Sequence, residues 1–255
     1  MRLSAPIYRL KQNAKRLARR DGIRLHEALD SIAAAEGYAE WSLLAARYSA
    51  ALSPAELYGR LRSGDCVLVA ARPGQGKTLL ALSLATHAVR VGRRSAFFTL
   101  EYTDSDVVAR LASIGFDPAE YPGNFSFDCS DAICADYIIG KTREVPSGTL
   151  IVIDYLQLLD QRRDTPPLSI QINLLKSHAV ELGLVVVFVA QIARAFDSSS
   201  KPVPDLTDIR MPNPVDLTVF NKAVFVHDGK IMLQECPTAG RLLPTEFPRN
   251  DRFTG

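Results

Sequence analysis

The sequence predicts an α/β fold in which helices flank a central, mostly parallel sheet, with a small all-α domain in front of it. The first observation behind this prediction is a strand, a glycine-rich loop and a helix that follow one another over residues 66–91. The second is a pair of apolar runs, over residues 149–153 and 184–190, typical of strands buried on both faces of a sheet. The third is a basic amphipathic pattern over residues 7–20, before any strand pattern begins.

Length and composition fit one globular core with a small appendage. The chain has 255 residues, 47% of them hydrophobic, and a net charge of +2, which are ordinary values for a soluble protein. No apolar run reaches the roughly 18 residues that a membrane-spanning helix needs, and the basic N-terminus lacks the apolar segment of a secretory signal. We therefore expect a cytoplasmic protein without a membrane anchor.

The cysteines form no recognisable motif. Cys66, Cys129, Cys134 and Cys236 are scattered without a Cys-x-x-Cys pair, and no histidine falls at metal-ligand spacing beside them. Reduced, structural cysteines are the expectation. A zinc or redox role for Cys129 and Cys134 is the alternative, but two ligands do not make a site.

Residues 1–52 are predicted to form a separate basic helical domain. Its first acidic residue comes after a run of basic ones, namely Arg2, Arg9, Lys11, Lys15, Arg16, Arg19 and Arg20. Apolar spacing predicts a helix ending near Asp21-Gly22 and two further helices around Leu25 and Trp41. Such a domain can place a helix on nucleic acid, because lysine and arginine neutralise phosphates. A docking or oligomerisation domain with a solvated charged face is the alternative, and the sequence leaves both open.

The second domain is predicted to begin at residue 53. The stretch Ser53-Pro54-Ala55-Glu56 combines an N-cap residue, a proline suited to the first helical position and a capping-box glutamate. After this short helix, Ser63-Gly64-Asp65 supplies the turn before the first strand. The predicted domains are therefore residues 1–52 and 53–255.

Eight consecutive residues are predicted to bind the phosphates of a nucleotide. They are Ala71, Arg72, Pro73, Gly74, Gln75, Gly76, Lys77 and Thr78. Gly74 and Gly76 let backbone N–H groups curl around an anion at a helix N-terminus, which adds partial positive charge. Lys77 can reach the β- and γ-phosphates, and the Thr78 hydroxyl can ligate Mg²⁺. Ala71 stands where this motif usually has glycine, so we expect an αR or β backbone there. The alternative is an ordinary strand-loop-helix connection.

Three polar side chains are expected at the sheet edge where this loop lies. Glu101, Asp154 and Gln191 each follow a predicted strand. Those strands span residues 95–100, 149–153 and 184–190, with a helix over 170–182 and a closing hairpin over 224–233. Ligands bind outside the carboxyl ends of parallel strands. Asp154 is therefore predicted to hold Mg²⁺ together with Thr78, because a hard cation takes oxygen ligands. For Glu101 the alternative is a surface glutamate.

Three segments resemble DnaB-type replicative helicases, in their C-terminal RecA-like ATPase domain. They are Ala70 to Thr78, Thr99-Leu100-Glu101-Tyr102 and Ile153-Asp154-Tyr155-Leu156-Gln157-Leu158, within a resemblance over about residues 57–233. The resemblance implies a RecA-like P-loop ATPase that uses ATP and Mg²⁺. It implies catalytic roles for Lys77 and Glu101, with Glu101 as the general base that polarises the attacking water.

The same resemblance implies partners. It implies that Gln191 belongs to the catalytic residues and senses the γ-phosphate. Gln191 would pass this signal to a loop that contacts single-stranded DNA, here residues 192–214 with Arg194, Lys201 and Arg210. A plain surface loop is the alternative. The basic helix over residues 7–20 is a second candidate surface for DNA. DnaB-type proteins work as rings, which implies a homo-oligomer, with a hexamer as one form.

One departure from the family pattern leaves more than one function open. DnaB-type domains carry a Lys-x-Arg motif, whose arginine reaches the nucleotide site of the neighbouring subunit. At the corresponding position this chain has Gln234-Glu235-Cys236. The leading hypothesis is an ATP-driven helicase or translocase, with Arg241, Arg249 or Arg252 as the substitute. The alternative is a regulatory or adaptor protein that hydrolyses ATP weakly, since an arginine finger is worth about 10³ to 10⁵ in turnover. A nucleotide-dependent kinase or clock-type protein is a third interpretation, for which no acceptor residue stands out.

Overall fold

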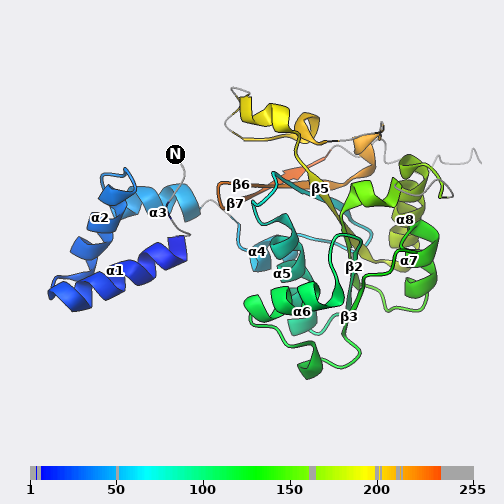
Figure 1. The fold of residues 1–255 in the computed structure, drawn as a ribbon, viewed down its shortest axis with the longest axis horizontal. Coiled ribbons are helices and arrows are strands. Elements are labelled where there is room, and N and C mark those ends of the chain that lie inside the picture. The colour runs from blue at the N-terminus through cyan, green and yellow to red at the C-terminus, as the bar shows by residue number, and fades with distance from the viewer. Residues whose placement is uncertain are drawn as a thin grey trace, which may run out of the picture.

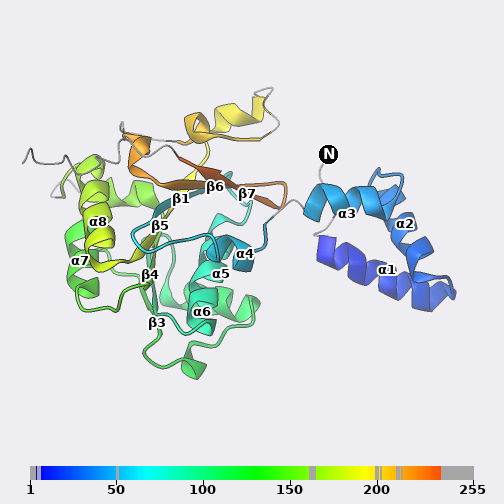
Figure 2. The same ribbon diagram turned by 180° about the vertical axis from the view of Figure 1, so that it is seen from behind.

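The computed structural model describes residues 4, 7–49, 52–160, 165–198, 201, 203–210, 213 and 215–236. A sheet flanked by helices forms the larger body, and three N-terminal helices stand to one side of it (Figure 1 and Figure 2). Among the described residues, no helix has both the length and the apolar character needed to cross a bilayer.

The N-terminal helices contact one another in sequence order. They are α1 (Ile7–Asp21), α2 (Leu25–Ala35) and α3 (Trp41–Ser49). Leu10 and Ala14 of α1 and Ala28 of α2 are buried, as their apolar spacing predicts. The Asp30 carboxylate accepts a hydrogen bond of 2.8 Å from the Trp41 backbone N–H, which joins the start of α3 to α2. The three predicted helices are present, and the domain boundary near residue 52 stays a prediction.

The helix α4 (Pro54–Tyr58) begins as its capping pattern predicts. The Ser53 hydroxyl accepts a hydrogen bond from the Glu56 backbone N–H (3.2 Å), and the Glu56 carboxylate accepts one from the Ser53 backbone N–H (2.8 Å). Leu57 then anchors the helix, since its side chain is fully buried. The predicted capping box is therefore confirmed.

Seven strands in the described part of the chain form one sheet, in the order β3-β2-β4-β5-β1-β6-β7. They are β1 (Cys66–Ala71), β2 (Ser95–Thr99), β3 (Phe125–Asp128), β4 (Leu150–Asp154), β5 (Val185–Gln191), β6 (Lys222–His227) and β7 (Lys230–Glu235). Neighbouring strands are parallel except in the β6–β7 hairpin. The predicted α/β class with a mostly parallel sheet is confirmed.

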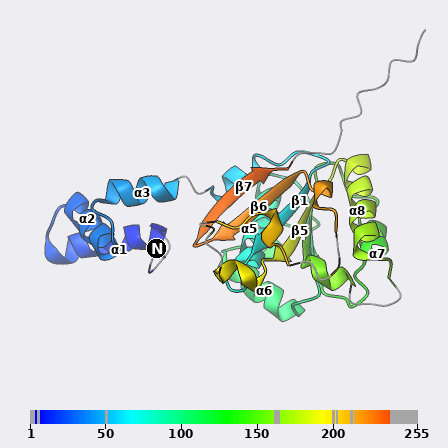
Figure 3. The same ribbon diagram turned by 90° about the horizontal axis from the view of Figure 1, so that it is seen from above.

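Helices cover both faces of this sheet (Figure 3). One face carries α5 (Lys77–Arg90) and α6 (Asp104–Ser113), and the other carries α7 (Ala135–Thr142) and α8 (Leu168–Leu182). Alternate residues of β1 serve the two cores: Cys66, Leu68 and Ala70 pack toward α8, and Val67, Val69 and Ala71 toward α5. Because side chains alternate along a strand, a strand covered on both faces reads as a continuous apolar run.

The sequence pattern predicts no element between residues 102 and 148, where the structure has α6, β3 and α7. The helix α6 begins at Thr103, whose hydroxyl accepts a hydrogen bond from the Asp106 backbone N–H (3.3 Å). The strand β3 lies at the sheet edge, has four residues, and buries none of them fully. Such a short, half-exposed strand lacks the apolar run by which the central strands were recognised.

Candidate functional site

The loop between β1 and α5 has the backbone expected of a phosphate-binding loop. Gly74 and Gly76 have φ values of +76° and +87°, a region that residues with a Cβ rarely adopt. A Cβ at either position would meet no atom within 4 Å, so the requirement for glycine is conformational rather than steric. Ala71 ends β1 without a positive φ, which confirms the expectation for its backbone.

Lys77, in the first turn of α5, lies against Glu101 just beyond the end of β2. The Lys77 Nζ and Glu101 Oε2 atoms are 3.6 Å apart, with side chains 9% and 33% exposed. The Glu101 backbone N–H donates a hydrogen bond of 3.1 Å to the Thr99 hydroxyl, which fixes the backbone where the strand ends. The ring of Tyr155 lies 5.7 Å from Lys77 Nζ, a cation–π contact that sequence analysis did not anticipate. Lys77 thus has two partners beside the loop.

Asp154 ends β4 as a buried carboxylate. The residue is 1% exposed, and neither carboxylate oxygen has a hydrogen-bond partner among the described residues. Burial raises the pKa of Asp154 to about 6, an increase that the Lys77 ammonium opposes. Asp154 pairs in register with Thr99, so Glu101 and Asp154 lie at the same edge of the sheet.

The surroundings of Asp154 fit a divalent cation. A buried carboxylate without a hydrogen-bond partner in the described residues needs a proton or a cation to offset its desolvation. Thr78, in the first turn of α5 and only 7% exposed, lies near enough for its hydroxyl to oppose the rise in the pKa of Asp154. Magnesium at a nucleotide takes one or two protein oxygens and completes its shell with phosphates and water. Thr78 and Asp154 therefore have the right donor atoms for the predicted Mg²⁺.

Gln191 ends β5 next to the phosphate loop. It pairs in register with Ala71, and the Ile192 backbone N–H donates a hydrogen bond of 3.0 Å to the Ala71 carbonyl. The Gln191 carbonyl accepts a hydrogen bond of 2.7 Å from the Arg210 backbone N–H. The predicted sensor residue is thus bonded through its backbone both to β1 and to the segment that follows β5.

Arg72 of the phosphate loop joins that same segment through its side chain. Its guanidinium donates to Asp197, from Nε to Oδ1 (2.9 Å) and from Nη2 to Oδ2 (2.6 Å), and from Nη1 to the Ile192 carbonyl (3.0 Å). Paired N–H···O bonds of this kind hold a carboxylate in a fixed orientation. Sequence analysis placed Arg72 in the loop but missed Asp197, since nothing local marks two residues 125 positions apart as partners.

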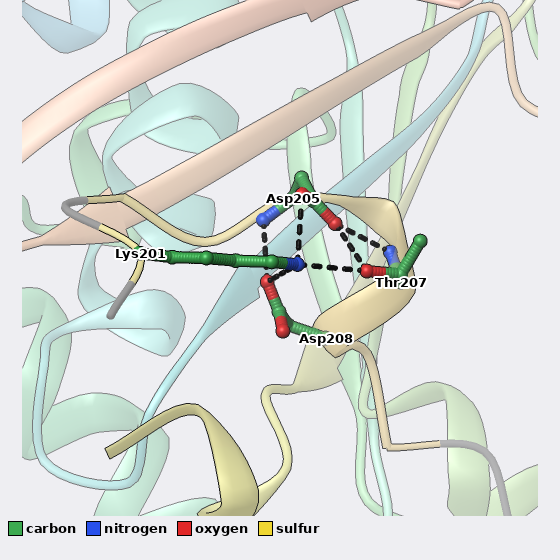
Figure 4. A network of polar contacts seen from close by, with 4 residues as sticks. All are labelled: Lys201, Asp205, Thr207 and Asp208. Carbon is green, nitrogen blue, oxygen red and sulfur yellow. Dashed lines mark hydrogen bonds and ion pairs between the residues drawn. The ribbon is translucent and has the colours of Figure 1, made fainter. Parts of the chain in front are cut away.

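Lys201 lies in the candidate nucleic-acid loop, surrounded by acceptors from the same loop (Figure 4). Its Nζ donates to Asp205 Oδ2 (2.9 Å), Thr207 Oγ1 (2.9 Å) and Asp208 Oδ2 (3.0 Å). Hydrogen bonds from the Thr207 hydroxyl and then from Lys201 lower the pKa of Asp205 to about 2. The charge of Lys201 is therefore neutralised within the loop. Residues 199, 200, 202, 211, 212 and 214 of this loop lie outside the described residues.

The two cysteines considered as metal or redox residues, Cys129 and Cys134, follow the edge strand β3. Burial is the main cause that raises the pKa of Cys129 to about 12, and a protonated thiol is a poor nucleophile and metal ligand. The described residues contain no group of three or more His, Cys, Asp or Glu side chains that could hold a metal ion. Cys134 is half-buried at the start of α7.

The far edge of the sheet carries the residues that replace Lys-x-Arg. Gln234 and Glu235 end β7, and Cys236 is buried just after it. The Glu235 carboxylate lies 3.7 Å from the buried ammonium of Lys222. The three predicted substitutes, Arg241, Arg249 and Arg252, lie outside the described residues.

Comparison with known proteins gives one consistent result. The family model described as the DnaB-like helicase C terminal domain matches residues 55–116 and 124–216, more than half of the chain. The probable plasmid replicative DNA helicase of Chlamydia muridarum is 29% identical over 181 residues, 59% of this chain and 40% of that protein. The replicative DNA helicase DnaB of Leifsonia xyli is 24% identical over 216 residues, 72% of this chain and 47% of that protein. The chain therefore spans less than half the length of these curated relatives.

Solved structures show the same fold. A DnaB-like replicative helicase, determined in a study of its interactions with primase, matches with a TM-score of 0.54 and 23% identity over 64% of this chain and 47% of that one. A second solved structure, described as an ATPase domain, matches with a TM-score of 0.53 and 23% identity over 65% of this chain and 70% of that one. At these identities the match establishes the fold alone.

Proposed function

Since the chain belongs to the DnaB-like helicase C-terminal domain family, we propose that it is an ATP-hydrolysing helicase or translocase that acts on single-stranded DNA. One observation supports this most directly. Glu101 and Asp154, at the carboxyl ends of the adjacent parallel strands β2 and β4, lie beside a glycine-rich loop, and Lys77 of α5 is 3.6 Å from Glu101. This is where α/β sheets bind nucleotides and where phosphoryl transfer needs a cation, a base and a carboxylate.

Each site residue has a distinct role in the proposed reaction. The backbone N–H groups of residues 71–78 bind the phosphates, with Lys77 on the β- and γ-phosphates. Glu101 accepts a proton from the attacking water, a contribution of about 10² to 10⁴ in rate. Thr78 and Asp154 would hold Mg²⁺, which supplies charge neutralisation at the triphosphate.

The proposed coupling to DNA runs through Gln191. Its amide offers donors and an acceptor to a γ-phosphate, and its carbonyl is bonded to Arg210 in the candidate DNA loop, residues 192–214. A change at the phosphate can therefore shift that loop through one residue. A homo-oligomer, with a hexameric ring as its proposed form, would place several such loops around one strand.

A second candidate function is an ATP-binding switch with weak hydrolysis, in the manner of an adaptor or regulatory protein. The observation that favours it is the pair Gln234-Glu235 where the family pattern has Lys-x-Arg. Without an arginine finger, turnover falls by about 10³ to 10⁵. The phosphate loop and Asp154 serve equally well in a protein that binds nucleotide and seldom cleaves it.

Steady-state ATP hydrolysis, measured with and without single-stranded DNA, separates the two functions. DNA-stimulated turnover together with strand separation supports the motor, whereas tight ATP binding with negligible turnover that no DNA changes supports the switch. Glu101→Gln should keep ATP binding and lose turnover, while Glu144→Gln, at an exposed residue after α7, should behave as wild type. Wild-type turnover in Glu101→Gln would show that the base lies elsewhere.

A further inference from the structure

The helix α1 carries a line of exposed cations. Lys11, Lys15 and Arg19 are all exposed, and their spacing of four residues places them on one helical face, about 6 Å apart along the axis. Leu10 and Ala14 of the same helix are buried, so the cations lie outside the buried stripe. The three cations therefore form an exposed ridge.

Within the described part of the chain, the ridge has no counter-charge. Lys11, Lys15 and Arg19 make no ion pair within the described residues, whereas Arg20 pairs with Asp21 at 2.6 Å. The acidic residues of the helical region are engaged elsewhere: Glu27 at the Arg24 N–H, Asp30 at the Trp41 N–H, Glu36 at Ser4 and Glu40 at the Ser42 hydroxyl. Like charges four residues apart destabilise a helix, so this arrangement is suited to an external polyanion.

In the candidate loop after β5, Lys201 is paired within the loop, whereas Arg194 and Arg210 are exposed. There the Lys201 ammonium is bonded to two carboxylates, Asp205 and Asp208, and the Arg72 guanidinium that reaches the loop is taken by Asp197. A phosphate would have to displace these carboxylates to bind either cation. The available positive charge is therefore greater on α1 than around Lys201.

The burial of Leu10 and Ala14 favours a nucleic acid over a membrane as the partner of α1. A helix that lies on a membrane inserts its apolar face between lipids, but Leu10 is 3% exposed and Ala14 is fully buried. These two side chains are not available to a membrane, whereas the three cations of the ridge are exposed. Charge alone suffices for the phosphate backbone of a nucleic acid, which is bound without reading the sequence.

We infer that the Lys11, Lys15 and Arg19 ridge of α1 is a sequence-independent binding surface for the phosphate backbone of single-stranded DNA. This inference rests on the proposed function, because that function supplies the polymer. It assigns part of the electrostatic affinity to α1, in addition to the exposed Arg194 and Arg210 of the loop after β5.

The test compares three variants of the full chain. One carries Lys11→Gln, Lys15→Gln and Arg19→Gln; the loop variant carries Arg194→Gln and Arg210→Gln; the control carries Arg60→Gln, Arg94→Gln and Arg143→Gln. The control residues are exposed and lie at the opposite edge of the sheet from the phosphate loop. Binding of a fluorescein-labelled oligothymidylate is followed by anisotropy over a range of salt concentrations, and circular dichroism reports whether α1 remains helical.

We expect the α1 variant to bind about 100-fold more weakly at about 0.1 M salt, with a salt dependence shallower by about 2, since each phosphate contact on a single strand contributes about 0.7 to the slope. The control should bind as wild type. An α1 variant with unchanged affinity and slope, beside a weakened loop variant, would overturn the inference and leave the proposed function standing. A wild-type chain that binds no oligothymidylate would overturn both, as would binding only to phosphatidylserine vesicles.

Discussion

Replacing Asp154 by asparagine tests the central feature of the site, a buried carboxylate with no hydrogen-bond partner in the described part of the chain. The pKa of Asp154 is raised from 3.8 to about 6, so the folded protein holds this proton more tightly than the unfolded chain does. The resulting stability is complete below pH 3.8 and is lost as the pH rises through about 6. Asparagine removes this titration. We therefore expect the stability of wild type relative to Asp154→Asn to fall by about 1.4 kcal/mol between about pH 5 and about pH 8.

Urea unfolding at both pH values, with EDTA present, measures this difference. Any pH-independent cost of the amide cancels, because only the change with pH is compared. Asp136→Asn, at an exposed aspartate of α7, is the control and should show no such change. Adding Mg²⁺ and ATP at about 100 times their dissociation constant should stabilise wild type by about 2.7 kcal/mol and leave Asp154→Asn little changed. A stability difference independent of pH, or equal stabilisation of both proteins by Mg²⁺ and ATP, would refute the reasoning.

Two further predictions concern the phosphate loop. Lys77→Ala should abolish ATP binding or turnover while the urea unfolding transition keeps its cooperativity, because Lys77 supplies the charge for the phosphates rather than the core. Calorimetric titration with ATP checks this, and normal turnover would contradict the assignment. Arg72→Lys keeps the charge but loses the paired bonds to Asp197, so hydrogen exchange of the Arg210 amide should accelerate roughly fivefold, about 1 kcal/mol for a partly exposed pair. Unchanged exchange would mean that the pair does not hold the segment after β5.

Much of the fold is predictable because its signals are local. The run from Cys66 to Ala71 is apolar because β1 is covered on both faces, and Gly74 and Gly76 mark positive φ directly. The arrival of Glu101 and Asp154 at one edge follows from the rule for parallel sheets. Those predictions needed no knowledge of distant contacts.

The remaining features depend on partners far away in the sequence or on short elements. The pairing of Arg72 with Asp197 spans 125 positions, and the burial of Asp154 depends on the helices that pack over β4. The edge strand β3 is too short for a periodic pattern. The resemblance at Gln191 places Lys201 in a candidate DNA loop, and only the structure reveals the carboxylates of Asp205 and Asp208 around it.

The contact between Lys77 and Glu101 orders the steps of the proposed cycle. While the Lys77 ammonium and the Glu101 carboxylate remain 3.6 Å apart, their ion pair opposes the activation of water by Glu101 in the proposed reaction. An incoming triphosphate draws the lysine toward itself and, in the same movement, releases the glutamate. In the proposed cycle, nucleotide binding therefore precedes the activation of water, and Glu101 becomes available as a base only after ATP is bound.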